Sequence, residues 1–148
     1  MATPSSVLLV ELIMSIDRLI ESAKKAQPNP NQWSAVITLG HVSQVDQQVW
    51  LPRVNQMVEA FNQEQKPPKF SWWEPDPLQT ELEFENLSLE QASGLAMQAR
   101  TNLVSVLRNL TPEQWLAPGV HDTFGQVTVG DLIFQALTHD EEHRSSFV

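Results

Sequence analysis

Apolar residues recur along this chain three and four positions apart, the spacing that places side chains on one face of an α-helix. The first such stripe predicts a helix from about Pro4 to Ala26, and Pro28 and Pro30 close it because proline cannot continue a helix. The residues on its apolar face are Leu9, Leu12, Ile13, Ile16, Leu19 and Ile20. No alternating strand pattern competes with the helical ones, and we therefore expect an all-α fold.

Two more helices are predicted in the middle of the chain. The second begins at Ser34, a favourable N-cap, and runs for about 30 residues, with a kink at Pro52, where one backbone hydrogen bond is lost. The third starts near Ser88, which stands at capping-box spacing from Gln91, and it stops before a short extra turn at residues 111–114. Both helices carry apolar stripes that would face a common core.

The fourth predicted helix follows Thr128 and reaches Phe147. Asp131 stands three residues after Thr128, as the acidic partner of a capping box. Four amphipathic helices in a chain of 148 residues predict one domain, residues 1–148, folded as a four-helix bundle.

The composition is that of an ordinary globular protein, and it excludes several functions. A formal net charge of −9, with Lys and Arg scattered along the chain, argues against a nucleic-acid partner, which would select a basic stripe. The chain has no cysteine, which rules out disulfides, thiolate ligands and a cysteine nucleophile. No apolar run approaches the roughly 18–20 residues that span a bilayer, and residues 1–6 lack the positive charge of a targeting signal. We therefore expect a cytoplasmic protein with no membrane partner.

Two histidines, His139 and His143, stand four residues apart in the fourth helix. They could share one metal ion, because residues i and i+4 are neighbours on a helix surface. The alternative is a hydrogen-bonded pair in the core, and the pair alone does not decide between the two. A third histidine, His41, lies near the start of the second helix. Alone it would be a core residue, but the three together would make an open metal site of the catalytic type.

The spacing of this pair is also that of the zinc-protease motif His-Glu-x-x-His. Asp140 stands where that motif has glutamate, and no third ligand follows in the sequence, so the motif does not fit. We expect Asp140, Glu141 and Glu142 to form a solvated face, with one of them able to orient an imidazole.

The metal hypothesis makes a prediction about topology. His41 lies near the beginning of the second helix and His139 near the end of the fourth, so one ion can bind both only if these helices run antiparallel. An up-down-down-up bundle meets this condition, but it needs a long crossover between the second and third helices. The proline- and tryptophan-bearing segment from Gln65 to Leu87 is long enough, because it can extend about 75 Å against a helix of roughly 45 Å.

Other polar and aromatic residues could belong to the same site. Gln44 and Gln48, further along the second helix, could face the ion, although water is a better occupant of open positions than glutamine. Trp72 and Trp73 in the crossover could cover a pocket or plug the apolar seam of the bundle. His121, in the loop before the fourth helix, could line the pocket and act as an acid or base. The commoner state of such a loop histidine is simple exposure.

Two stretches of the sequence resemble the DinB/YfiT-like family. Residues 33–53, which contain Asp46 and the run Trp50-Leu51-Pro52-Arg53, resemble the second helix of these proteins. Residues 119–133 resemble the segment that leads into their final histidine pair. The resemblance covers most of the chain and implies an up-down-down-up four-helix bundle. It also implies a divalent metal, nickel or zinc, held by His41, His139 and His143.

The resemblance leaves the reaction open. A metal-dependent enzyme would lower the pKa of a bound water or thiol, as a hydrolase of a small molecule or as a transferase with a low-molecular-weight thiol as cosubstrate. Mycothiol-dependent maleylpyruvate isomerases are similar in layout but place a glutamate where this chain has His139. The alternative is a non-catalytic binding or stress-associated protein, with a structural or vestigial metal site and a closed pocket. By analogy with relatives, either is compatible with a homodimer through the bundle faces.

Overall fold

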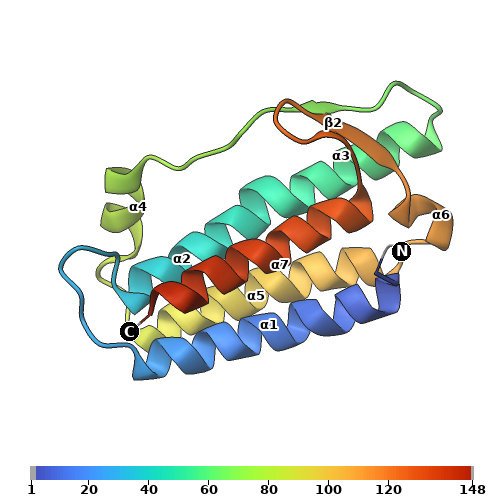
Figure 1. Ribbon diagram of the computed structural model, residues 1–148. Coiled ribbons are helices and arrows are strands. Elements are labelled where there is room, and N and C mark those ends of the chain that lie inside the picture. The colour runs from blue at the N-terminus through green and yellow to red at the C-terminus, as the bar shows by residue number, and fades with distance from the viewer. Residues whose placement is uncertain (1–2, 148) are drawn as a thin grey trace.

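The computed structural model describes residues 3–147 and is mostly helical. Its long helices lie side by side as a bundle (Figure 1). The bundle is built from α1 (Ser5–Lys25), α5 (Leu89–Arg108), α7 (Val129–Ser146) and a composite helix made of α2 (Ala35–Val45), η1 (Asp46–Trp50) and α3 (Leu51–Asn62). These four units lie where the sequence pattern predicts helices. Within the described residues, no helix is long and apolar enough to cross a membrane.

The predicted N-caps begin the helices that follow them. Ser34 caps α2, Ser88 caps α5 and Thr128 caps α7, and each hydroxyl accepts a hydrogen bond from the backbone N–H three residues further along. At α5 and α7 the third residue closes a capping box, as the sequence indicates. The expected extra turn is α6 (Pro112–Trp115), which also begins with a capping box.

A π-helical turn, η1, interrupts the composite helix just before Pro52. The backbone N–H of Leu51 donates to the carbonyl of Asp46, five residues back, rather than to the residue four back. Pro52 has no N–H to donate and occupies one of the first positions of α3. The irregularity predicted at Pro52 is therefore a π turn, which inserts one residue and rotates the rest of the helix by about 100°.

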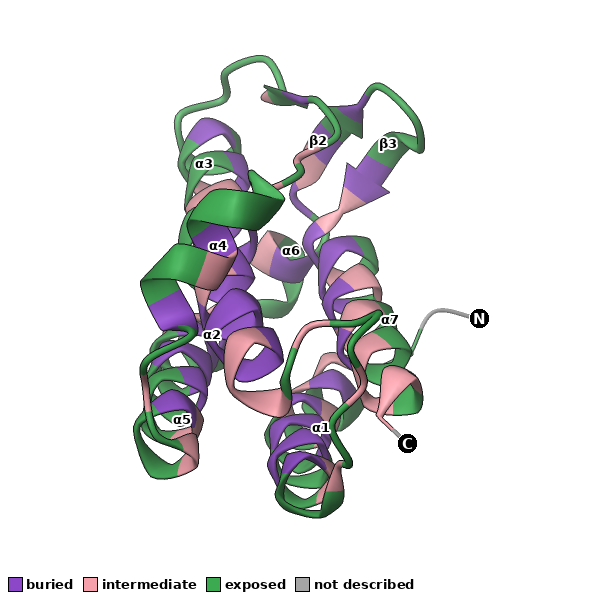
Figure 2. Cartoon of the chain, turned by 90° about the vertical axis from the view of Figure 1, so that its left-hand side faces the viewer, coloured by how far each residue is buried: buried purple, intermediate pink, exposed green. Residues whose placement is uncertain are grey.

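The buried residues of the long helices lie on the faces that they turn toward one another (Figure 2), and most of them are apolar. α1 packs against α5 and α7, and α2 packs against α5. Ile13, which the apolar pattern places on the buried face of α1, is 42% exposed, because Leu8 and Ser15 continue that face instead. Fully buried side chains include Leu12, Ile16, Leu19, Leu39, Leu103 and Leu107.

The all-α expectation is wrong in one place, where a small sheet lies against α3 and the start of α7. Its strands are β1 (Lys69–Phe70), β2 (Pro118–His121) and β3 (Gly125–Thr128), in the order β1-β2-β3. β1 is parallel to β2, and β2 is antiparallel to β3. Strands of two to four residues are too short to show an alternating pattern, so the sequence does not reveal them.

The hydrogen bonds of the sheet connect the crossover to the segment before α7. The hairpin of β2 and β3 turns through Gly125, whose φ of 73° lies in the left-handed region that favours glycine. The N–H groups of Val120 and Asp122 donate to the carbonyls of Pro68 and Phe70, at 2.9 and 3.0 Å respectively. Residues far apart in sequence are thereby held together beside α3.

The crossover from α3 to α5 is more ordered than the loop that the sequence predicts. It returns along the bundle, so that α5 begins near the end of the molecule where α2 begins and α7 ends (Figure 1). The crossover contains α4 (Pro77–Phe84), which packs on α2. Gly40 makes this contact possible, because a Cβ atom at that position would overlap the ring of Phe84.

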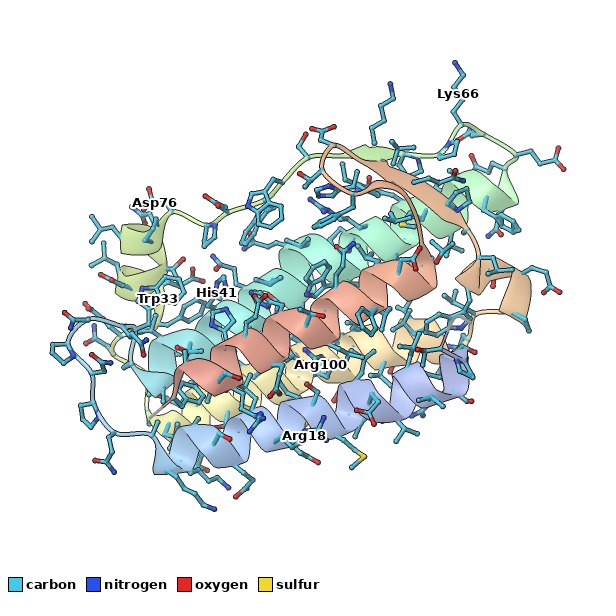
Figure 3. The ribbon with its side chains drawn as sticks, viewed as in Figure 1. Arg18, Trp33, His41, Lys66, Asp76 and Arg100 are labelled. Atoms are coloured by element: carbon cyan, nitrogen blue, oxygen red, sulfur yellow. The ribbon has the colours of Figure 1, made fainter. Side chains whose placement is uncertain are left out.

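The side chain of Arg100 lies in the interior of the bundle (Figure 3). Arg100 of α5 is 1% exposed and lies between Asp46 of η1 and Asp140 of α7. Its guanidinium donates two hydrogen bonds to each carboxylate, at 2.8 and 3.2 Å to Asp46 and at 2.8 and 2.9 Å to Asp140. It also donates to the backbone carbonyl of Leu12 in α1, and Ser15 of α1 donates to Asp140. All four helical units therefore meet at one charge.

We expect Gly40→Ala to destabilise the protein by about 1–3 kcal/mol, because the added methyl group overlaps the buried Phe84 ring. Gly94→Ala in α5 is the matched control, since its added atom meets nothing within 4 Å. It should be neutral or stabilising by up to about 1 kcal/mol. Chemical denaturation measures both variants, and Phe84→Leu should reduce the Gly40→Ala penalty in a double-mutant cycle. Equal effects of the two glycine substitutions would contradict the close approach of α2 and α4.

Arg100→Met should destabilise the protein by about 3–5 kcal/mol, because it leaves two aspartates buried without their cation. Arg108→Met, at the exposed end of the same helix, should change the free energy of unfolding by no more than about 0.5 kcal/mol. Urea denaturation compares the two variants. If Arg100→Met destabilises no more than this control does, the buried network is not a source of stability.

Candidate metal centre

Three histidines from two helices converge at one end of the bundle. His41 lies on α2, and His139 and His143 lie on α7. Their candidate ligand nitrogens all lie within 4.8 Å of one another. The ring centroid of His41 is 5.2 Å from that of His139 and 5.0 Å from that of His143. The structure thus brings together the three residues that the sequence singles out.

Contacts outside the cluster orient His41 (Figure 3). Its Nδ1 lies 3.2 Å from Oε1 of Gln44, so Nδ1 carries the proton and Nε2 keeps its lone pair for the cluster. The hydroxyl of Thr80 in α4 donates to the same Oε1 at 3.4 Å. The Trp33 ring contacts His41 edge-on at 5.0 Å between centroids, and its indole N–H donates to Glu81 of α4. The helix α4 of the crossover therefore holds in place the two residues, Gln44 and Trp33, that contact His41.

His139 and His143 face each other directly. Their Nε2 atoms are 3.1 Å apart, a distance that one shared proton or one ion can bridge. A tetrahedral ion with bonds of about 2.0–2.1 Å to imidazole nitrogens separates two ligands by about 3.3 Å. The spacing of this pair is therefore compatible with that geometry.

Burial lowers the pKa of all three imidazoles and so favours their neutral form. It lowers the pKa of His41, and the hydrogen bond with Gln44 opposes this shift. Burial, together with the neighbouring charges of His143 and His41, lowers the pKa of His139 to about 3. Burial and the charge of His41 lower the pKa of His143 to about 4, against the effect of the Asp140 carboxylate. Neutral imidazole is the form that binds a metal, so this donor set fits a divalent ion.

The π turn decides which residues share the face of His41. In an uninterrupted helix, Gln48 and Pro52 would follow His41 on that face. Instead Gln48 is exposed, while Val49 and Arg53 line the space next to His41. Gln48, which the sequence allows to face the ion, is therefore not among the residues that line this space, because the π turn shifts the register of the helix.

The acidic residues between the two histidines of α7 have three different environments. Asp140 is 1% exposed and pairs with Arg100, so the prediction of a solvated face is wrong for this residue. Glu141 is exposed and pairs with a neighbouring arginine on α7. Glu142 is exposed and borders the pocket beside the histidines. In the described part of the chain none of the three is hydrogen-bonded to an imidazole, and Gln44 has that role instead.

A pocket of about 570 Å³ lies beside the histidines. Its lining is mainly apolar and aromatic, as is usual for small-molecule sites. Trp72 and Trp73 of the crossover, for which the sequence allows a lid or a plug, both line this pocket. Trp73 stacks on His41 with 6.5 Å between the ring centroids. Further lining residues are Val45, Val49, Trp50, Phe124, Phe134 and Thr138.

His121 lines the same pocket but does not belong to the histidine cluster. It ends β2 and is only 4% exposed, so the expectation of an exposed loop histidine is wrong. Its Nδ1 accepts a hydrogen bond from the backbone N–H of Thr123 at 3.0 Å, which leaves the proton of the neutral ring on Nε2. Burial and the positive charge of Arg53 lower the pKa of His121, and the Asp122 carboxylate opposes this.

Solved structures with a similar fold include those of two proteins. YfiT from Bacillus subtilis, described as a probable metal-dependent hydrolase with an unusual four-helix bundle topology, matches with a TM-score of 0.68 at 13% identity, over 95% of this chain and 82% of that one. A mycothiol-dependent maleylpyruvate isomerase matches with a TM-score of 0.67 at 9% identity, over 98% of this chain and 61% of that one. This chain therefore spans less than two thirds of the isomerase, and at such identities the likeness shows the fold alone. Among curated protein sequences, none matches this chain.

The sequence itself carries a family assignment. The model of the DinB superfamily matches residues 11–146, a range that contains all three histidines of the cluster and nearly the whole bundle. By this match the chain belongs to the DinB superfamily.

Proposed function

We propose that this protein binds a divalent cation through His41, His139 and His143 and uses it to hydrolyse a small molecule held in the adjoining pocket. The observation that carries the proposal is the convergence of three imidazoles beside an aromatic pocket. YfiT, whose fold is similar, is described as a probable metal-dependent hydrolase, which supports the same class of reaction here. When bound, the ion would supply Lewis-acid chemistry and acidify a water or a thiol.

The residues of the chain would hold and orient the reactants. Three protein nitrogens leave coordination positions open, which is typical of catalytic rather than structural zinc sites. Imidazole suits both zinc and nickel, so either ion is compatible with the proposal. His121 would donate a hydrogen bond from Nε2 to a bound substrate, because its Nδ1 already accepts one from the backbone.

The proposal includes the up-down-down-up order of the helices. A site that joins the start of α2 to the end of α7 needs these helices to run antiparallel, and the crossover through α4 supplies the return path. The contacts of His41 with both histidines of α7 support this order.

Thiol-dependent transfer is the second candidate, and the similarity to a mycothiol-dependent isomerase favours it. The chain has no cysteine, so the thiol would have to be a cosubstrate. A non-catalytic protein of this fold would be expected to have a closed pocket, whereas the pocket beside the histidines measures about 570 Å³. The pocket therefore supports an enzyme over a vestigial site.

Protein purified without a histidine tag should contain about one divalent ion per chain by elemental analysis. His41→Ala and His143→Ala should each lose the ion, because only two imidazoles remain. His121→Ala is the matched control, since this fourth histidine lies outside the cluster, and it should keep the ion. Gln44→Ala, which frees the ring of His41, should weaken metal affinity by about 10–100-fold. Metal that persists in both cluster variants would refute the site.

The lowered pKa values of His139 and His143 also predict a pH dependence of stability in metal-free protein. Histidine in the unfolded chain titrates near pH 6.5, whereas the folded-state pKa values of His139 and His143 are about 3 and about 4. Between these values the unfolded state binds more protons, so the free energy of unfolding should fall as the pH drops from about 6.5 toward about 4. Urea denaturation across this range measures the slope. His139→Leu should flatten it, and an unchanged slope would show that His139 is not buried in its neutral form.

A further inference from the structure

The pocket has a second polar end, away from the three histidines. Arg53 lies about three turns after His41 on the composite helix and lines the same pocket. The two Cα atoms are separated by roughly 18 Å along the helix axis, at about 1.5 Å per residue. A ligand that contacts both ends must therefore be elongated.

Arg53 is a half-buried cation, and no carboxylate within residues 3–147 forms an ion pair with it. An arginine has five N–H donors, and over the same residues the only hydrogen bond of Arg53 is from Nη2 to the backbone carbonyl of Ser71, at 2.7 Å. Its guanidinium lies over the Phe70 ring, 4.9 Å from the centroid, which orients the planar fork. Donors remain that can pair with a ligand.

His121 adds a donor at the same end of the pocket. Its Nδ1 accepts a backbone N–H, so the neutral ring presents Nε2–H. His121 is the cross-strand partner of Phe70, over whose ring the Arg53 guanidinium lies, and both Arg53 and His121 line the pocket. Asp122 is the closest acidic neighbour in sequence, and its carboxylate accepts a hydrogen bond from the Ser71 hydroxyl at 2.8 Å rather than pairing with Arg53.

The other residues that line the pocket restrict the charge and polarity of a ligand that could bind there. Glu142 borders the pocket next to the histidine cluster, and Glu74 borders it where it accepts the indole N–H of Trp72. These two carboxylates disfavour a second anionic group, so an acidic ligand would place its charge at Arg53. The pocket also has an aromatic wall, formed by Trp50, Trp72, Trp73, Phe124 and Phe134.

We propose that the pocket binds an elongated amphipathic carboxylate. Its acidic group pairs with the fork of Arg53 and with Nε2 of His121, the bidentate pairing that guanidinium and carboxylate favour. Its apolar chain or ring lies against the aromatic wall, and its reactive group reaches the three histidines. The position of the reactive group rests on the proposed function, whereas the pairing with Arg53 does not.

The test compares phenylhexanoate with its neutral amide, phenylhexanamide, as probes. Each is titrated near neutral pH into protein stripped of metal, and binding is followed by tryptophan fluorescence and calorimetry. The carboxylate should bind at least about tenfold more tightly than the amide, as expected for a charge-assisted hydrogen bond. Arg53→Gln should abolish this preference and leave the affinity for the amide unchanged. Arg108→Gln, which removes an exposed cation from α5, should preserve it.

The inference would be overturned if the parent protein bound the two probes with equal affinity or bound neither of them saturably. It would also be overturned if Arg53→Gln lowered the affinity for both probes by the same factor. Thermal unfolding establishes that each variant is folded. Arg53→Lys is the second variant, and it should keep only part of the preference because it retains the charge without the fork. Since the titrations use metal-free protein, a failed metal analysis with an intact preference for the carboxylate would reject the proposed metal site alone. Stoichiometric metal with no preference would reject the carboxylate pocket alone.

Discussion

The ion network around Arg100 is the interaction on which the rest of the structure depends. Burying a charge is unfavourable unless it is paired and hydrogen-bonded, and this guanidinium meets both conditions through two carboxylates and a backbone carbonyl. The two aspartates belong to the two units that carry the histidines, since Asp46 lies just over one turn after His41 and Asp140 directly follows His139. A slide of either helix would break short, directional bonds in the interior. The network therefore sets the register in which the imidazoles meet.

The crossover is part of the candidate site as well as a connection. Its helix α4 supplies Thr80, which holds Gln44 against His41, and its preceding segment supplies two tryptophans of the pocket wall. The groups that hold His41 in place are the amide of Gln44 and the hydroxyl of Thr80, which are uncharged. The three imidazole ligands carry no negative charge either. An ion held in such surroundings would keep more of its charge available for reactants than one whose ligands are backed by carboxylates.

Local rules are sufficient to predict the four long helical units, though not α4, because periodicity and capping boxes such as that of Thr128 are encoded in nearby residues. The histidine cluster could also be predicted, since the spacing of two members and the long crossover point to one arrangement. Arg100 lies on the buried stripe of α5, a signal in the sequence, but its partners Asp46 and Asp140 are far away along the chain. The exposure of Gln48 was beyond prediction because it follows from a π turn, which no periodic rule anticipates. The strands escape prediction because two to four residues are too few to show an alternating pattern.

The π turn also affects how such a pocket can diversify. It divides one continuous helix into a half that carries His41 and a half that carries Arg53, and the rotational setting of the second half depends on the number of residues in η1. Loss of one residue there would leave His41 in place and turn the second half by about 100°. Arg53 would leave the wall, and a neighbour of different chemistry would replace it. Insertions and deletions confined to η1 are thus a route by which related proteins could exchange one substrate for another while inheriting the same histidine cluster.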